Sequence, residues 1–375
     1  MALPDFDIAR ITTERHAARS VRKRRVSWLG SLIVGWTILA LMLSWTVARP
    51  QQHATTSVPT PRSIDSADSF NENVFANNFD VAWSGVSNVL LALPGSNLTG
   101  RLYLPSTWTS ATPAVVLMHG CKGLWSLGQP WPDRPDAIAQ SAIERWGLEL
   151  SRNGYIALAI DSFTSRTPLG IASADYQNQC QGELFEGSVD PYVTRVGDID
   201  FGIAWLRSRL NIAATTPIAA IGWSEGAESV LVRAAETDRL EDTSLYQTPA
   251  DEAEALRAAV AFYPGCGSNL GFNRTTESFW RPHRDLKLNH AELDPLNVHC
   301  ASRADTALTV YGSEPDSGHW IDWTLYADAH HSFDTSPTLE WPDRPCSLGD
   351  ALDADVCAQR SADIDSLAFL TQRLH

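Results

Sequence analysis

The 375-residue chain is apolar enough to build a sizeable core, with 44% hydrophobic and 19% charged residues. This composition excludes an intrinsically disordered protein and leaves room for one large domain or two ordinary ones. A net charge of −15 argues against a general nucleic-acid binder, whose surface is basic. Residues 1–49 carry a net charge of +5 and the remaining 326 carry −20, so we expect the two parts to occupy different surroundings.

The N-terminal region predicts a membrane anchor. Residues 1–25 form a basic tail, and Val26–Ala48 contains no charged residue. At a rise of ~1.5 Å per residue this segment spans roughly 34 Å, enough for a hydrocarbon core. The preceding Lys/Arg cluster should hold the tail in the cytoplasm, with Trp28 and Trp45 at the interfaces. We favour a retained signal anchor at 26–48 over the alternative of a cleaved signal peptide, which has a shorter apolar core.

The chain beyond the anchor is therefore expected on the exported side, periplasmic or extracellular. Residues 49–78 are polar and proline-containing, which predicts a flexible linker. All six cysteines lie beyond this linker, where an oxidising compartment permits disulfides. Proximity alone favours Cys346 with Cys357, and a bond between Cys121 and Cys180 is plausible. Reduced, buried cysteines are the alternative.

Residues 79–375 have the pattern of one α/β domain. Short apolar runs alternate with helical patterns, which predicts a mostly parallel central sheet flanked by helices. The predicted parallel strands are 114–118, 155–160, 218–221, 258–262, 307–311 and 321–326. Segments 81–92 and 100–104 predict an opening antiparallel hairpin, and apolar residues spaced by three and four predict an amphipathic helix over 193–210.

The sharpest motif is Gly222-Trp223-Ser224-Glu225-Gly226, between a predicted strand and a predicted helix. G-x-S-x-G in this context is typical of a nucleophile elbow, a tight turn that projects the serine hydroxyl outward. Glycines at both flanks let the crowded backbone pass. Ser224 is therefore the candidate nucleophile.

A serine hydroxyl needs a base to remove its proton and a carboxylate to orient that base. Asp316, in the loop after the predicted strand 307–311, is the preferred acid, and Glu314 is its competitor. His330 and His331 follow the next predicted strand, and one of them is the base. Asp328 and Asp334 are weaker acid candidates because they flank the base.

Two backbone N–H groups should receive the negative charge of the acyl-transfer transition state. One is that of Glu225, directly after the nucleophile. The other should come from the loop His119–Gly123 after an early strand, with Cys121 the preferred donor and Lys122 the alternative. A catalytic thiol at Cys121 is a weaker interpretation because it lacks an elbow. His119 is expected to order the loop.

A zinc site is a further alternative, although no H-E-x-x-H or C-x-x-C spacing supports it. The side chains available for such a site are Asp316, His319, His330, His331 and Asp334. We predict that the protein holds no metal.

Several motifs together resemble the dienelactone hydrolase family of α/β-hydrolases. The resemblance is carried by 119–123, 161–166, Arg195 with Asp198, the elbow at 222–226 and 331–333. It implies an α/β-hydrolase fold, selects His331 over His330 as the base and aligns Asp316 with the family's acid. The family has cysteine at the elbow where this chain has Ser224, so the resemblance does not extend to lactone specificity.

Three long inserts, 124–137, 177–192 and 269–297, are expected to form pocket walls, although no substrate-binding residue is identified. Arg166 and Lys122 are candidates to meet an anionic substrate, but pairing of Arg166 with Asp198 is the preferred interpretation.

The sequence therefore predicts a membrane-anchored serine hydrolase that cleaves an ester-type bond through an acyl-enzyme, without a cofactor. Its predicted partners are a small-molecule ester or lactone and the membrane, which it meets through the N-terminal helix, and not nucleic acid. The alternatives are a non-catalytic surface binding domain on the same fold and an exopeptidase.

Overall fold

The computed structural model describes residues 85–93, 96–180, 188–235, 256–265, 284–296, 300, 321–335, 339–347 and 352–375. The predicted basic tail, membrane anchor and linker lie outside these residues. None of the helices in the described ranges combines the length and hydropathy that a bilayer span requires.

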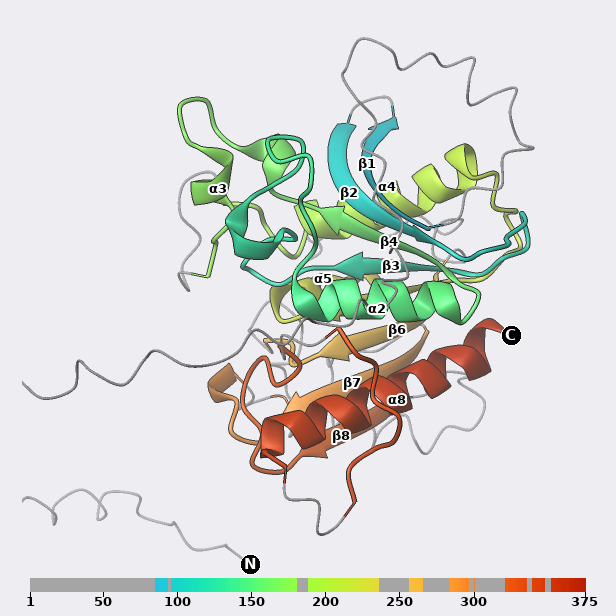
Figure 1. The fold of residues 1–375 in the computed structure, drawn as a ribbon, viewed down its shortest axis with the longest axis vertical. Coiled ribbons are helices and arrows are strands. Elements are labelled where there is room, and N and C mark those ends of the chain that lie inside the picture. The colour runs from blue at the N-terminus through green and yellow to red at the C-terminus, as the bar shows by residue number, and fades with distance from the viewer. Residues whose placement is uncertain are drawn as a thin grey trace, which may run out of the picture. The chain divides into compact units, whose positions relative to one another are not determined.

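The described chain is organised around one eight-stranded sheet with the order β1-β2-β4-β3-β5-β6-β7-β8. β2 pairs antiparallel with β1 and with β4, whereas β4, β3 and the strands that follow run parallel. The strands are β1 (Gly85–Leu93), β2 (Ser96–Leu104), β3 (Ala114–Met118), β4 (Ile156–Asp161), β5 (Ile218–Trp223), β6 (Leu256–Phe262), β7 (Asp285–Ala291) and β8 (Ile321–Tyr326). Parallel strands place all their carboxyl ends at one edge, so the loops after β3 to β8 meet there (Figure 1).

Most of the predicted strands are confirmed, including the opening hairpin and the runs at 114–118 and 321–326. One of the predictions was wrong. The segment 269–297 was interpreted as a pocket-wall insert, but its residues 285–291 form β7, between β6 and β8. Its sequence Asp-Leu-Lys-Leu-Asn-His-Ala contains the polar residues Lys287, Asn289 and His290, which are all buried. Lys287 and Asn289 are hydrogen-bonded to side chains of other elements. The predicted strand 307–311 lies outside the described residues.

Helices cover both faces of the sheet (Figure 1). The helices are α2 (Ser141–Arg152), α3 (Ser173–Tyr176), α4 (Thr194–Arg209), α5 (Glu225–Arg233) and α8 (Ala354–Leu374), with 3-10 turns η1 (Ser126–Gly128) and η2 (Thr164–Arg166). α4 and α5 pack on one face, whereas α2 and α8 pack on the other. The predicted amphipathic helix over 193–210 is α4.

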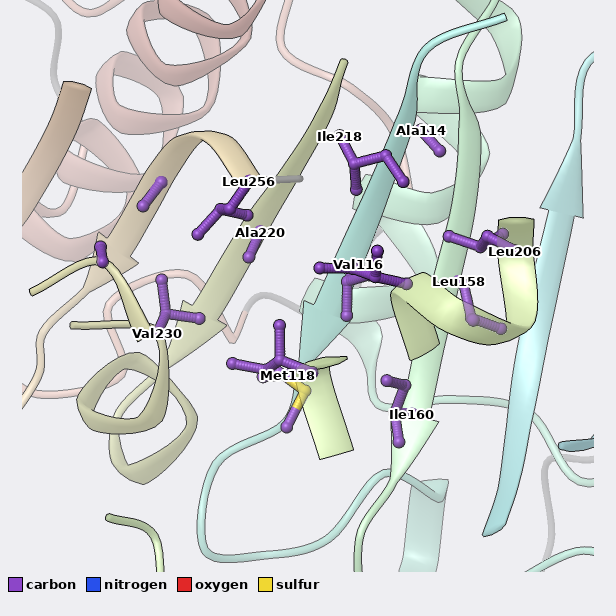
Figure 2. Packing of buried hydrophobic residues seen from close by; sticks show 14 of the residues in the cluster. Ala114, Val116, Met118, Leu158, Ile160, Leu206, Ile218, Ala220, Val230 and Leu256 are labelled. Carbon is purple, nitrogen blue, oxygen red and sulfur yellow. The ribbon is translucent and has the colours of Figure 1, made fainter. Parts of the chain in front are cut away.

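Strand alternation divides the core into two apolar layers. In β3, Val116 and Met118 face α4 and α5, whereas Val115 and Leu117 face α2 and α8. Figure 2 shows the first layer, in which side chains of β3, β4 and β5 meet Leu206 of α4 and Val230 of α5. All of β3, β4 and β5 is buried, which leaves their carboxyl-end loops as the accessible part of the central strands.

Two disulfides join described segments. Cys346 bonds Cys357, which confirms the pairing favoured from proximity, and Cys121 bonds Cys180. Their Cα–Cα distances of 5.2 Å and 4.9 Å lie within the ordinary range for such bonds. The second disulfide joins the loop after β3 to the segment after α3.

The sheet order, the antiparallel second strand and a serine turn between β5 and α5 define an α/β-hydrolase fold. The fold expected from the sequence is therefore present in the described chain. Its carboxyl edge is where the candidate site residues converge.

Candidate active site

The serine motif forms a strained turn between β5 and α5. Ser224 has φ 52° and ψ −119°, a conformation that non-glycine residues rarely adopt. A Cβ at Gly226 would collide with the carbonyl oxygens of Met118 and His119, and a Cβ at Gly222 would collide with the backbone of Gly226. Glycine is therefore required at both positions, as the motif predicts. The Ser224 N–H donates to the Phe262 carbonyl at 2.9 Å, which holds the turn against β6.

His331 is the histidine that reaches the serine. Its Nε2 lies 3.0 Å from Ser224 Oγ, and the histidine comes from the loop after β8. His330 points elsewhere: its backbone N–H donates to Asp355 at the start of α8, and its side chain is 64% exposed. The structure thus brings together the predicted Ser224 and His331. It separates His330 from them.

The carboxylate at the other ring nitrogen belongs to Asp294, not to the predicted Asp316. Asp294 Oδ2 lies 2.7 Å from His331 Nδ1, and the Asp294 side chain is fully buried. Its Oδ1 accepts the Leu296 backbone N–H at 2.8 Å, so both carboxylate oxygens are held. A neutral imidazole carries one N–H, which this bond places on Nδ1; the lone pair on Nε2 then faces Ser224. Asp316 and its competitor Glu314 lie outside the described residues.

Strand β7 explains why the sequence analysis did not include Asp294. The acid was sought after a strand at 307–311, whereas the strand next to β8 is 285–291 and ends three residues before Asp294. Two backbone bonds then join the loops after β7 and β8. Glu292 N–H donates to the Tyr326 carbonyl, and Leu293 N–H donates to the Ala329 carbonyl. These bonds bring the carboxylate beside the histidine.

The loop after β3 lies against the nucleophile, as expected for an oxyanion loop. A Cβ on Gly120 would lie 3.4 Å from Ser224 Cβ. Cys121 follows it, and its carbonyl accepts the Gln179 N–H at 2.8 Å, beside the disulfide to Cys180. Glu225 is the first residue of α5, where backbone N–H groups lack helical partners. Glu225 is therefore next to Ser224 in the chain, and Cys121 directly follows Gly120, the residue that approaches Ser224 in space.

His119 organises this loop, as its sequence position suggested. Its Nδ1 donates to the Gly120 carbonyl at 2.6 Å, and its Nε2 accepts the Ser162 N–H at 3.1 Å. Burial, reinforced by the nearby Arg195 guanidinium, holds the pKa of His119 well below its usual range. The ring is thus neutral and has both nitrogens occupied, which excludes it from proton transfer.

The disulfide offers a direct test of the oxyanion loop. If the Cys121 N–H is an oxyanion donor, Cys121→Ser/Cys180→Ser should lower kcat by roughly 10- to 100-fold, because displacement of that N–H would remove part of the transition-state stabilisation. Cys346→Ser/Cys357→Ser is the matched control and should retain kcat, since that bond lies before and within α8. Steady-state ester hydrolysis by the two variants makes the comparison. Equal losses in both would show that the disulfides contribute only to general stability.

A carboxylate cluster surrounds the first turn of α5. Glu225 Oε2 lies 3.2 Å from the buried guanidinium of Arg195, and Glu228 is hydrogen-bonded by Tyr192 and by the Gly265 backbone. Burial raises the pKa of Glu228 to about 8, and burial also raises the pKa of Glu225. Glu228 is therefore protonated at neutral pH in the folded chain.

This protonation predicts a pH-dependent stability. An unfolded glutamate has a pKa near 4.5, so the folded state binds the extra proton between that value and about 8. The free energy of unfolding should therefore decrease as pH rises through this window. Glu228→Gln removes the titration, so denaturant midpoints measured at several pH values should fall less steeply than in the wild type. Parallel curves for the two proteins would contradict the assignment.

Arg166 and Lys122 are the residues that the sequence offered for contact with an anionic substrate. Arg166 makes a bidentate pair with Asp198 at 2.6 and 2.8 Å, which confirms the preferred interpretation. Lys122 lines a cavity of about 600 Å³ together with Trp125 of the 124–137 insert and Thr335 of the loop after β8. Neither Ser224 nor His331 lines this cavity, so the role of the insert as a wall of the substrate pocket stays a prediction.

Asp328 and Asp334, the weaker acid candidates, contact neither Ser224 nor His331. Asp328 is exposed and its N–H donates to Glu292, whereas Asp334 is buried beside Trp223 and Tyr263. Within the described ranges, no group of three or more His, Cys, Asp or Glu side chains is arranged to hold a metal ion. His319 of the zinc alternative lies outside them.

The sequence did not single out Asp294, Tyr263 or Trp223 as site residues. Asp294 was placed inside a supposed insert, and only recognition of 285–291 as a strand would have located it. Tyr263 directly follows β6, and its ring contacts that of His331 edge-on at 4.8 Å. Its position after an apolar strand is a weak signal.

The chain has distant likenesses among solved structures. No family model matches it, and no curated protein matches it. It is similar to esterase 2 of Thermogutta terrifontis phosphorylated by paraoxon, at 14% identity and a TM-score of 0.42 over 77% of this chain and 94% of that one. The butyrate-bound form of that esterase gives 16% identity and 0.44 over the same shares. A Klebsiella pneumoniae protein assigned as a dienelactone hydrolase gives 13% and 0.48 over 76% and 98%.

Proposed function

We propose that this chain is a serine hydrolase that cleaves an ester-type bond of a small molecule through an acyl-enzyme. The observation that carries the proposal is the continuous hydrogen-bonded series Ser224, His331 and Asp294 at the carboxyl edge of the sheet. An inert domain has no need of a serine in a strained turn with a buried carboxylate behind its histidine.

The geometry supports acylation as the first step. His331 Nε2 accepts the proton of Ser224 Oγ as the oxygen attacks the substrate carbonyl, and Asp294 stabilises the resulting imidazolium. The tetrahedral oxyanion forms beside the N–H groups of Glu225 and Cys121, our proposed donors. His331 then gives its proton to the leaving alcohol, and the acyl group stays on Ser224.

Deacylation follows by the same groups in reverse. A water takes the place of the alcohol, His331 removes one of its protons, and the hydroxyl oxygen attacks the acyl carbon. Collapse of the second tetrahedral intermediate breaks the bond to Ser224 Oγ, which recovers its proton from His331. The products are a carboxylic acid and an alcohol, and no cofactor takes part in these steps.

A fluorophosphonate probe and short-chain p-nitrophenyl esters test the proposal on the exported part of the chain, from about residue 65 onward. We expect a single label on Ser224, located by peptide mass spectrometry, together with ester turnover. A folded protein that neither labels nor turns over would contradict the hydrolase and favour a binding domain on the same fold. Turnover of peptide amides in preference to esters would favour the exopeptidase.

We also propose that residues 26–48 anchor the chain in a membrane with the hydrolase domain on the exported side. The uncharged apolar run and the basic residues before it support this proposal. Mass spectrometry of the protein purified from membranes should recover peptides from the Met1 region. Recovery of a mature N-terminus beyond residue 48 would instead identify a cleaved signal peptide.

A further inference from the structure

Three residues beyond His331 lies a carboxylate that the proposed mechanism does not use. Asp334 is fully buried. Its Oδ2 accepts the indole N–H of Trp223 at 2.6 Å, and its Oδ1 accepts the hydroxyl of Tyr263. Both oxygens of this carboxylate are therefore bound, one by the last residue of β5 and the other by the residue that follows β6.

These two partners adjoin the candidate nucleophile and base. Trp223 is the last residue of β5 and directly precedes Ser224. Tyr263 follows β6, and its ring lies 4.8 Å from the ring of His331 at an interplanar angle of 64°. Asp334 thus joins the residue before the nucleophile to the aromatic ring that packs on the base.

The same carboxylate belongs to a longer buried network. Arg145 of α2 donates to the Asp334 carbonyl at 3.2 Å and pairs with Asp363 of α8 at 3.1 Å. Asp363 also accepts the indole N–H of Trp146 at 2.9 Å. Within this network, Asp334 contacts the residues that adjoin Ser224 and His331. The described hydrogen bonds of Asp363 instead go to Arg145 and Trp146 of α2.

The backbone between His331 and Asp334 needs such a constraint. Ser332 within this segment has φ 65°, and Tyr263, which binds Asp334, has φ 38°; residues other than glycine rarely adopt these left-handed conformations. Strained residues persist only where surrounding contacts determine them. Asp334 supplies these contacts from the far end of the four-residue segment. Phe333 adds apolar packing against Tyr263 and Tyr326.

We propose that Asp334 is a positioning residue that holds the His331 imidazole in line with Ser224 by tying the base loop to Trp223 and Tyr263. The inference rests on the proposed hydrolase function. Release of these two bonds would let the loop relax, and the 3.0 Å contact between Nε2 and Oγ would lengthen or lose its alignment. Chemistry should suffer more than substrate binding, because Asp334 is buried beneath the site.

Two variants isolate this role. Asp334→Asn retains the shape of the side chain but has one acceptor oxygen for two donors, and Tyr263→Phe removes one donor while it keeps the ring on His331. We expect kcat to fall roughly 10- to 100-fold in Asp334→Asn and less in Tyr263→Phe, with KM within about twofold of wild type in both. The double variant should be little slower than Asp334→Asn, because both changes remove the same bond.

Asp363→Asn is the matched control. It removes a buried carboxylate from the same network, so it should lower the melting temperature while it leaves kcat unchanged. A second readout follows the base directly: the low-field proton resonance of His331 Nδ1–H, identified by its loss in His331→Ala, should shift or broaden in Asp334→Asn but not in Asp363→Asn. If Asp334→Asn fails to fold, Tyr263→Phe carries the same comparison.

The outcomes separate the two proposals. A wild-type protein that reacts with the fluorophosphonate probe, beside folded Asp334→Asn and Tyr263→Phe variants with unchanged kcat, would overturn the positioning role alone. An equal loss of kcat in Asp363→Asn would also overturn it, since stability would then explain the effect. A folded wild type without labelling or turnover would overturn both proposals.

Discussion

Ser224→Ala and His331→Ala should each lower kcat for p-nitrophenyl ester hydrolysis by about 10⁵- to 10⁶-fold, because removal of either member disables the whole unit. Ser224→Ala removes the only atom that the proposed mechanism acylates. His331→Ala leaves the hydroxyl without a base at the 3.0 Å position. Fluorophosphonate labelling should disappear in the first variant and become very slow in the second.

His330→Ala is the matched control for the histidine. It removes the neighbouring imidazole, which is 64% exposed and contacts Asp355, so kcat should stay within about twofold of wild type. Circular dichroism spectra and thermal melts establish that each variant is folded. Substantial turnover by a folded Ser224→Ala protein would refute the assignment of the nucleophile.

Asp294→Asn is expected to lower kcat by about 10⁴-fold at neutral pH, the second largest effect. The neutral amide presents an N–H to His331 Nδ1 as readily as an oxygen, which favours the tautomer with the proton on Nε2. That tautomer donates toward Ser224 and accepts no proton from it. Hydroxide-dependent attack should partly replace the lost base, so the variant's kcat should rise at high pH.

Asp316→Asn distinguishes the two acid assignments. Asp294 already fills the Nδ1 position of His331 at 2.7 Å, and one imidazole N–H makes one such bond. We therefore expect Asp316→Asn to keep kcat within about twofold of wild type. If Asp316→Asn instead causes the large loss and Asp294→Asn does not, the acid predicted from the sequence is the functional one.

The parts of the fold that could be predicted are those with strong local signals. The wholly apolar runs at 114–118 and 218–221 are typical of buried parallel strands, and the structure has strands there. The motif 222–226 predicts a tight strand-to-helix turn, because the close backbone approach in such a turn requires glycine at Gly222 and Gly226. Local patterns were therefore sufficient to locate Ser224 and the loop that carries His331.

β7 could not be recognised because its burial depends on partners far away in sequence. Lys287 is buried and its ammonium binds Asp322 of β8 at 2.9 Å, and Asn289 donates to Ser366 of α8 at 2.9 Å. No local sequence pattern predicts that these buried polar side chains will find such distant partners. Because Asp294 follows this strand, the same omission left Asp294 out of the acid candidates, and Asp316 was preferred.

The contacts of Asp334 with Trp223 and Tyr263 also join residues that are distant in sequence, so local patterns could not predict them. Trp223 and Asp334 are 111 residues apart, and Tyr263 and Asp334 are 71 apart. From the sequence, Asp334 is only a weaker candidate for the acid, because it lies close to the base. Its contacts with Trp223 and Tyr263, on which the proposed positioning role rests, arise only in the folded chain.

The order of the strands also determines when the protein gains reactivity during synthesis. Ser224 follows β5, whereas Asp294 and His331 follow β7 and β8, the last two strands of the sheet. A nascent chain that ends after α5 contains Ser224, but it lacks β6, which holds the turn, and it lacks the residues proposed as base and acid. Under the proposed mechanism, reactivity arises only when β6, β7 and β8 have joined the sheet beside β5, so a chain truncated before β8 should not hydrolyse esters.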